Sequence, residues 1–462
     1  MSELGTPDAP LRVAIIGSGP SGFYAAERLL SRPDLHVQVE MFDRLPTPFG
    51  LVRGGVAPDH QKIKSVTKVY DRIAAHPEFR FYGNVEIGRA LAREDLLAYV
   101  HAVIYAVGAA TDRRMGIPGE HLPGSHSATD FVGWYNGHPD YRCLSFDLSA
   151  ERALVVGNGN VAMDVARILA STTTELTATD IADHALTALT GSGVREIILL
   201  GRRGPAQAAF TPKELKELGE LEDVDVIADP REVGLDELSQ AAVDAAPDRN
   251  RDENIKVMAH YAERSPAGRH RRVVLRFLAS PVELIGTDRV EAVRIVHNQL
   301  APAADGSLRP RATDRTEELP VGLVFRAIGY QGTPIPGLPF DDWNAVIPNR
   351  AGRIMDGDTQ VPREYVVGWI KRGPQGIIGT NKPDSHETVD ALLEDLAAGT
   401  LPATPVGPRA VMQRLVAERA EVVSYQDWLT LDAAEKQRGE DAGGRPRVKF
   451  TRVDQMLEAL GR

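Results

Sequence analysis

Three closely spaced glycines follow an apolar, β-branched run near the start of the chain and lead into an alanine-rich stretch. In this G-x-G-x-x-G pattern, Gly17 permits a tight turn, Gly19 lets the backbone approach a pyrophosphate, and Gly22 lets helix and strand pack closely. The helix that follows supplies free N–H groups and partial positive charge for phosphates at its amino terminus. The pattern therefore predicts a dinucleotide-binding turn that also includes Pro20 and Ser21.

An acid stands where such a turn needs one. Asp43 ends the apolar segment HVQVEMFD, which is typical of a second strand. Dinucleotide-binding folds place a ribose-binding carboxylate at the end of that strand. Glu40 is the competing acid, but it lies inside the strand pattern. The alternative is a purely structural glycine turn followed by an unrelated acid. Because strand, helix and acid all occur at the positions expected of a dinucleotide fold, the nucleotide site is favoured.

The same strand–glycine–helix order occurs again in RALVVGNGNVAMDVARILA. The second turn has the pattern G-x-G-x-x-A and comprises Gly157, Asn158, Gly159, Asn160, Val161 and Ala162. Both strands are nearly continuous apolar runs, as expected for parallel strands covered on both faces. The sequence thus predicts an α/β fold with two Rossmann-like dinucleotide-binding domains.

Two adjacent arginines indicate which pyridine dinucleotide the second turn binds. They follow the apolar run of REIILLGRRGP, at the position where an NAD site carries an acid for the ribose 2′-hydroxyl. The guanidiniums of Arg202 and Arg203 suit a phosphate dianion, and no acid is there to repel it. A solvated strand end is the alternative interpretation. The position of the pair favours NADP.

Composition excludes several classes of protein. A length of 462 residues suggests two or three domains, and a net charge of −11 argues against wholesale nucleic-acid binding. Cys143 is the single cysteine, which rules out a disulfide framework, a CxxC redox pair and a four-thiolate iron–sulfur site. Neither a signal peptide nor an apolar run of membrane-spanning length is visible, so we expect a cytoplasmic protein.

Several stretches are less informative. The segment 172–192 is interpreted as surface decoration, and 241–252, which is polar and contains a proline, as a loop. Helices are expected at about 409–424 and 454–460, with the glycine- and charge-rich GEDAGGRPR between them as a mobile loop. Strands ending near Val107 and at Gly329 are expected to carry the chain between its domains.

Five blocks in order give the chain a specific resemblance. It resembles the adrenodoxin-reductase-like family of ferredoxin–NADP reductases from about Arg12 to its carboxyl terminus. The blocks are GSGPSGFYAA, TPFGLVRGGVAPDH, GNGNVAMDVAR, GRRGP with FTPKEL, and GWIKRGPQGIIGTNK. The resemblance implies an FAD domain built from 11–112 and 329–462, and an NADP domain, 113–328, inserted into it. Asp43 departs from the family, in which many members have the longer glutamate.

The resemblance also implies cofactor contacts. Leu51 and Val85 would line the FAD site, and the last block would complete it through Trp369, Gly376, Ile377 and Ile378. NADP would be held by Arg113, by Asn158 to Val161, by Arg202 and Arg203, and by Glu214. The last block itself predicts a glycine-rich turn before an amphipathic helix that starts near 383–385, whose amino terminus would stabilise negative charge on a reduced flavin.

Hydride transfer from NADPH to FAD depends mainly on positioning, so no protein nucleophile is needed. His60 and Glu217 are candidates for a hydrogen-bonded pair near the redox centre, because the resemblance associates the corresponding residues with the active site. A structural histidine in a loop is the alternative.

Reduced FAD can release its two electrons singly, which suits a ferredoxin or flavodoxin as a separate partner of a monomeric enzyme. The stretch GRHRRVVLRFL, with Arg269, Arg271, Arg272 and Arg276, could offer such an acidic carrier a basic face, although a solvated outer face is the favoured interpretation. Three alternatives stay open: a diaphorase that feeds another acceptor, an NADPH-dependent flavin monooxygenase, and a non-catalytic dinucleotide sensor.

Overall fold

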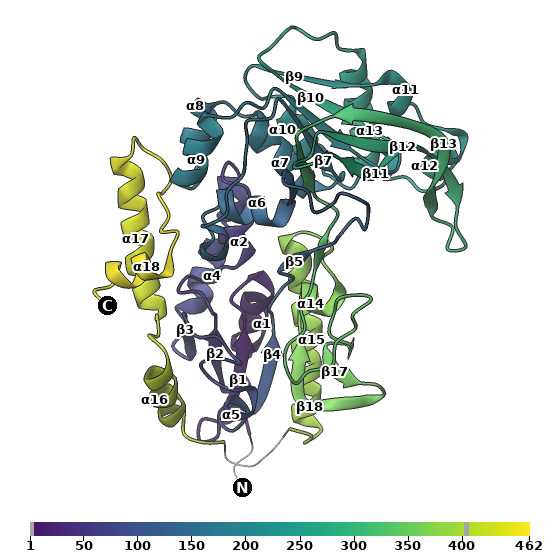
Figure 1. Cartoon of the computed structure of the whole chain (residues 1–462). Coiled ribbons are helices and arrows are strands. Elements are labelled where there is room, and N and C mark those ends of the chain that lie inside the picture. Colours follow the sequence, from purple (N-terminus) through teal and green to yellow (C-terminus); the bar gives the residue numbers. More distant parts are fainter. Residues whose placement is uncertain (1–3, 402–405) are drawn as a thin grey trace. The chain divides into compact units, whose positions relative to one another are not determined.

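Two sheets of mainly parallel strands, connected through helices, form the framework of the chain (Figure 1). The structure is a computed structural model and describes residues 4–401 and 406–462. The chain divides into two units: Met1–Val56, His60–Thr111 and Tyr330–Arg462 form unit 1, and Ala57–Asp59 with Asp112–Gly329 form unit 2. Each unit has its own parallel strands, so the predicted α/β class is confirmed.

Unit 1 is built around a seven-stranded sheet in the order β16-β17-β18-β4-β1-β2-β3. The strands β3, β2, β1, β4 and β18 are parallel, and β16 and β17 add an antiparallel edge. The strands are β1 Leu11–Ile16, β2 Val37–Phe42, β3 Phe79–Tyr82, β4 Ala102–Tyr105, β16 Asn349–Arg350, β17 Arg353–Asp356 and β18 Thr359–Val366. Because β18 pairs with β4, distant parts of the sequence share one sheet.

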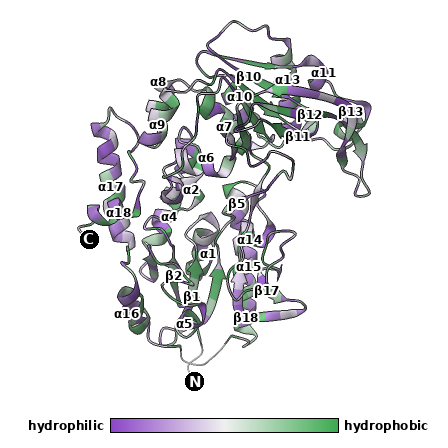
Figure 2. Cartoon of the chain, in the orientation of Figure 1, coloured by the Kyte–Doolittle hydropathy of each residue, from purple (hydrophilic) through white to green (hydrophobic). Residues whose placement is uncertain are grey.

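Helices cover both faces of this sheet. One apolar core lies under α1, α4, α15 and α17, and a second lies under α5 and α16. The helices are α1 Pro20–Leu30, α2 Leu51–Gly54, α3 Gln61–Lys64, α4 Thr67–Ala74, α5 Arg93–Leu97, α14 Trp369–Arg372, α15 Asn381–Ala397, α16 Arg409–Arg419, α17 Tyr425–Asp441 and α18 Val453–Ala459. In Figure 2, β1 is largely green, whereas α17 is mostly purple.

Unit 2 contains a parallel six-stranded sheet in the order β6-β14-β7-β8-β10-β9. Its strands are β6 Ser125–Ser127, β7 Arg152–Val156, β8 Glu196–Leu200, β9 Val224–Ala228, β10 Arg271–Arg276 and β14 Leu323–Arg326. An antiparallel sheet of β11 Ala279–Ile285, β12 Ala292–Pro302 and β13 Leu308–Pro320 packs on one face.

The other face of this sheet carries the main helical core of unit 2. The helices of the unit are α6 Ala128–Tyr135, α7 Asn160–Ala170, α8 Thr173–Thr177, α9 Asp183–Thr190, α10 Pro212–Leu218, α11 Pro230–Val233, α12 Glu237–Ala245 and α13 Arg249–Glu263. Among them, α7 lies directly after the strand that carries the second glycine turn.

Four features of the local structure were predicted wrongly or missed. The segment 172–192 forms α8 and α9, and its Leu176, Ile181 and Leu189 are buried in the core rather than decorating the surface. The segment 241–252 is not a loop, because α12 and α13 cover most of it, each capped by an aspartate side chain. Helix α17, which lies between the two helices expected at about 409–424 and 454–460, was not predicted. The GEDAGGRPR segment is anchored rather than free, because Arg447 pairs with Asp432 of α17.

Candidate functional site

The first glycine turn joins β1 to α1 in unit 1. Gly17 has a φ of 105°, and a Cβ there would lie 2.5 Å from the carbonyl oxygen of Ala106. A Cβ at Gly22 would lie 2.3 Å from the carbonyl oxygen of Gly17, so helix and turn are in close contact. The side of Gly19 on which a Cβ would lie is open, with no atom within 4 Å of an added Cβ. The turn is therefore closed on its protein side and open where a pyrophosphate would approach, which fits a dinucleotide.

Asp43 follows the end of β2 and binds the same turn. Its carboxylate accepts hydrogen bonds from the N–H of Ser18 at 3.0 Å, from the Ser18 hydroxyl at 2.5 Å and from the N–H of Leu45 at 2.9 Å. Burial raises the pKa of Asp43, although these hydrogen bonds oppose the shift. The competing acid, Glu40, accepts a hydrogen bond from the Tyr82 hydroxyl and pairs with Arg409 within unit 1. Asp43 is thus the acid that contacts the glycine turn.

The predicted residues Leu51 and Val85 lie in different surroundings. Leu51 begins α2 and is 36% exposed. Val85 is buried, and its N–H donates to the carbonyl oxygen of Asp43 at 2.9 Å. Val85 is therefore placed beside the acid that follows β2.

The glycine-rich block of 368–380 also lies against α1. Gly368 has a φ of 76°, and a Cβ there would lie 2.2 Å from the Ser21 hydroxyl oxygen. The Ser385 hydroxyl of α15 donates to the carbonyl oxygen of Ser21 at 2.9 Å. The indole N–H of Trp369 is buried and has no hydrogen-bond partner among the described residues. An unmade hydrogen bond of this kind fits a polar atom of a ligand.

The helix after this block starts earlier than predicted. A single 3₁₀ turn, Ile378–Thr380, leads directly into α15 at Asn381. Pro383 falls in the first turn of α15, where a missing N–H costs no helical hydrogen bond. Gly376 has a φ of 81° and Ile377 is 64% exposed, so this turn presents an apolar side chain outward.

The second glycine turn joins β7 to α7 in unit 2 and repeats the geometry of the first. Gly157 has a φ of 140°, and a Cβ there would lie 2.3 Å from the carbonyl oxygen of Ala327. Gly159 again has no atom within 4 Å of an added Cβ. Ala162 is fully buried in the place of the third glycine. This turn, too, leaves space at its second glycine for a pyrophosphate.

The two asparagines of this turn are fixed by the loop after β8. The carbonyl oxygen of Asn158 accepts a hydrogen bond from the N–H of Ala209 at 2.9 Å, and the Asn160 side chain accepts one from the N–H of Thr211 at 2.9 Å. Val161 is half-buried against the core. The loop that carries the predicted phosphate-binding arginines is thus tied to the glycine turn.

Arg202 and Arg203 follow β8 after one residue, Gly201. Among the residues that the structure describes, neither guanidinium is paired with a carboxylate. Burial lowers the pKa of Arg203, and the positive charges of Arg202 and Arg309 lower it further. Arg309 of β13 has its own partner, Asp305, at 2.8 Å, whereas Arg202 and Arg203 have no carboxylate counter-ion among the described residues, which fits a bound phosphate. Sequence reasoning did not single out Arg309, because it lies far from this pair in the sequence.

Comparisons with known proteins identify the family. A family model described as pyridine nucleotide-disulphide oxidoreductase matches residues 11–199. The chain is 48% identical to NADPH-ferredoxin reductase FprA of Mycobacterium tuberculosis, over 97% of this chain and 98% of that protein. It is 41% identical to the mitochondrial NADPH:adrenodoxin oxidoreductase of Salvelinus fontinalis, over 98% of this chain and 92% of that one. The structure of M. tuberculosis FprA in complex with NADPH matches with a TM-score of 0.92 over 98% of this chain and 100% of the other.

The chain belongs to the NADPH-ferredoxin reductase family. The resemblance inferred from the five sequence blocks is confirmed. The matching family model is named for disulphide chemistry. The present chain, however, contains a single cysteine, Cys143, which is exposed and not part of a disulfide. Within residues 4–401 and 406–462, every helix is too short or too polar to cross a bilayer.

The remaining predicted residues of the reductase lie in both units. Arg113 is exposed, and its N–H donates to the carbonyl oxygen of Gly329 at 3.0 Å. His60 caps α3 in unit 1, where its carbonyl oxygen accepts the N–H of Ile63 at 3.1 Å. Glu217 lies in α10 of unit 2 and pairs with Lys213 at 3.3 Å. The pairing of His60 with Glu217 stays a prediction.

Sequence reasoning also missed Arg167, a buried cation of the reductase's second domain. Its guanidinium donates to Asp59 at 2.5 and 3.2 Å, to Asp164 at 2.6 Å and to Glu214 at 3.0 Å. Burial opposes the charge, but the surrounding acids raise the pKa of Arg167 well above its ordinary value. The available signal was an arginine inside the apolar pattern of α7. Glu214, predicted to contact NADP, is anchored by this cation.

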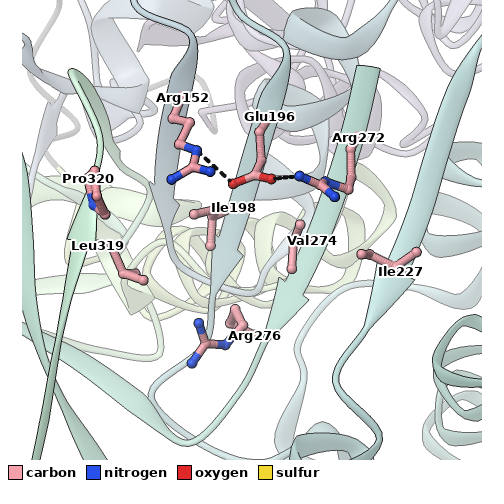
Figure 3. Close-up of a pocket in the computed structure, with 9 residues that line it drawn as sticks. All are labelled: Arg152, Glu196, Ile198, Ile227, Arg272, Val274, Arg276, Leu319 and Pro320. Carbon is pink, nitrogen blue, oxygen red and sulfur yellow. Dashed lines mark hydrogen bonds and ion pairs between the residues drawn. The ribbon is translucent and has the colours of Figure 1, made fainter. Parts of the chain in front are cut away.

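The arginine-rich stretch of β10 does not form a free basic face. Figure 3 shows Arg272 and Arg152 on either side of Glu196, joined to it by ion pairs. Arg276 pairs with Glu232 at 2.9 Å and with Glu317 at 3.0 Å, and Arg271 donates to the carbonyl oxygen of Ser171 at 2.6 Å. The adjoining pocket, about 270 Å³ in volume, is lined by Ile198, Ile227 and Val274. Acidic neighbours and backbone carbonyls therefore engage three of the four arginines proposed as a landing site.

Proposed function

We propose that this chain is an FAD-dependent NADPH:ferredoxin oxidoreductase. The observation that carries the proposal is the pair of glycine turns, each open at its second glycine, with two arginines after the second that have no carboxylate partner among the described residues. When bound, FAD accepts a hydride from NADPH and passes electrons singly to a carrier. The relatives named NADPH-ferredoxin reductase support this assignment.

The proposal divides the cofactors between the two domains. Residues 11–112 and 329–462 would bind FAD through Gly17–Gly22, with Asp43 close to the ribose. The further FAD contacts would be Leu51, Val85, Trp369, Gly376, Ile377 and Ile378. The open space at Gly19 supports this assignment, as does the indole N–H of Trp369, which has no hydrogen-bond partner within residues 4–401 and 406–462.

The inserted domain, 113–328, would bind NADP through the turn Gly157–Val161. The residues around it would be Arg113, Arg202, Arg203 and Glu214, with the two guanidiniums of 202–203 receiving the 2′-phosphate. Their lack of a carboxylate partner among the described residues supports that role, because a phosphate then supplies the counter-charge.

His60 and Glu217 are proposed to act together in hydride transfer by orienting groups near the redox centre. His60→Gln is expected to slow flavin reduction by NADPH in a stopped-flow experiment by roughly tenfold, the effect of losing one positioned hydrogen-bonding group. An unchanged rate would remove this pair from the proposal.

A ferredoxin or flavodoxin is the proposed acceptor, and we propose a monomer in the cytoplasm. A single exposed cysteine fits a reducing compartment. This part of the proposal does not depend on which iron–sulfur cluster the ferredoxin carries.

One anaerobic titration tests the assignment. The purified protein is expected to be yellow, NADPH should bleach its flavin absorbance, and ferredoxin should restore that absorbance while becoming reduced. Colourless protein would indicate a dinucleotide sensor. Under air, stoichiometric peroxide or a hydroxylated product would indicate a monooxygenase, and reduction of quinones but of no ferredoxin or flavodoxin would indicate a diaphorase.

A further inference from the structure

The segment Phe49–Gly54 passes directly over the first glycine turn. The N–H of Phe49 donates to the carbonyl oxygen of Ser18 at 3.0 Å, and a Cβ at Gly50 would lie 2.9 Å from the Cα of Gly19. Phe49 has a φ of 85°. Bulky residues seldom adopt positive φ, and such a conformation persists only where surrounding contacts hold it. The contacts that hold Phe49 therefore also determine how the segment lies on the turn.

Helix α17 supplies two of those contacts. The ring of Trp428 meets the ring of Phe49 edge-on, with centroids 5.7 Å apart. The guanidinium of Arg53, in α2, lies over the Trp428 ring at 5.2 Å and donates to both carboxylate oxygens of Glu435, at 2.8 and 2.5 Å. Two helical turns separate Trp428 from Glu435, so both project from one face of α17. That face of α17 therefore contacts α2 through Arg53, and contacts Phe49, the residue before the helix cap Gly50.

The carboxylate of Glu435 is completely buried and highly connected. Besides Arg53, it accepts hydrogen bonds from Arg447 at 3.2 Å and from the N–H of Phe450 at 2.8 Å. Burial alone would raise its pKa, but the charge and hydrogen bonds of Arg53, with those of Arg447, outweigh burial and lower the pKa. Glu435 is thus held ionised, and removing its charge deprives Arg53 of its carboxylate and leaves Arg447 with Asp432, to which it is also paired at 2.7 Å.

We propose that Trp428 and Glu435 are positioning residues for the flavin dinucleotide. Through Phe49 and Arg53 they hold α2 against the glycine turn, so α17 contributes to FAD retention although it carries none of the predicted cofactor contacts. This inference rests on the proposed function, because it takes the first turn to be the FAD site. If α17 only anchored the carboxyl-terminal region, its loss would lower stability without changing flavin release.

The test measures how fast FAD leaves the oxidised holoprotein well below its melting temperature, by the rise in free-flavin fluorescence. Glu435→Gln is expected to speed release by about tenfold or more, since a buried charge-assisted pair is lost. Trp428→Leu should act in the same direction, and the visible circular dichroism of the bound flavin should change in both variants. Glu440→Gln, on the exposed face of the same helix, is the matched control and should behave like the wild type.

A second variant separates positioning from stability. Arg53→Met with Glu435→Leu removes both charges of the buried pair together, which costs less stability than removing one of them, although Arg447 and the N–H of Phe450 lose an acceptor. If this double variant melts like the wild type but releases FAD about tenfold faster, the positioning role holds. If it or Glu435→Gln releases FAD at the wild-type rate, the inference is overturned. Wild-type protein without flavin would instead overturn the proposed function.

Discussion

In the proposed NADP site, the choice between NADPH and NADH is expected to depend on two adjacent guanidiniums. Arg202 and Arg203 lie after β8, and the pKa of Arg203 is already lowered by burial and by neighbouring positive charge. A bound 2′-phosphate would relieve that repulsion, whereas the 2′-hydroxyl of NADH would not. Discrimination should therefore be lost when the charges are lost.

Replacing both arginines by serine is expected to raise the KM for NADPH by about 100-fold, the effect of losing two charge-assisted hydrogen bonds. The KM for NADH should change by less than about threefold, because NADH presents no 2′-phosphate. Steady-state kinetics with both dinucleotides measures the ratio. Arg269→Ser, at an exposed position elsewhere in unit 2, is the control. Equal increases for both dinucleotides would remove the phosphate assignment.

At the scale of elements, each strand–turn–helix unit must both fold into a tight turn and leave room for a ligand. The first and second glycines of the turn serve these two requirements separately. Gly157 has a positive φ and its Cβ would meet a backbone carbonyl, so it is needed for the fold. Gly159 has an extended backbone and open space around it, so its missing side chain is needed only by a ligand. The two positions therefore form a natural experimental pair.

Gly157→Ala is expected to destabilise the protein by about 2–4 kcal/mol, because a Cβ at positive φ must also displace the Ala327 carbonyl. Gly159→Ala should leave the melting temperature unchanged and raise the Kd for NADPH by about tenfold, since its methyl group would occupy the approach of the pyrophosphate. Thermal melting and dinucleotide titration of both variants check this. A stable Gly157→Ala, or a Gly159→Ala variant that binds NADPH normally, would contradict the interpretation.

The sequence revealed those elements whose signal is local. Glycine spacing, apolar strands and the acid after β2 all lie within short segments, and the structure has the strands and helices there. Helix α17 was missed because most of its residues are polar and only a few, such as Trp428 and Leu431, face the core. Arg167 was missed for a different reason: its partners Asp59 and Glu214 come from remote segments, and only the folded chain brings them together.

At the scale of the whole molecule, charge governs how an acidic electron carrier would approach. The net charge of −11 repels such a carrier, and salt screening of that repulsion would speed the reaction. A local basic surface would have the opposite effect, because salt would screen an attraction. The sign of the salt dependence therefore separates docking on a basic surface from an encounter governed by net charge.

Docking of an acidic carrier on a protein of net charge −11 requires a local basic surface that outweighs the repulsion. We therefore expect ferredoxin reduction to slow as salt rises from about 50 to 500 mM, a range over which the Debye length falls well below 10 Å. The β10 arginines should not be the cause, because Arg272 is paired with Glu196, and Arg276 with Glu232 and Glu317. Arg272→Gln is therefore expected to change the KM for ferredoxin and its salt dependence by less than about twofold. Removing a charge on which the carrier docks would change both by more than that. If Arg272→Gln abolished the salt dependence, the attraction would reside on β10 after all, and its ion pairs would have to open when the carrier docks.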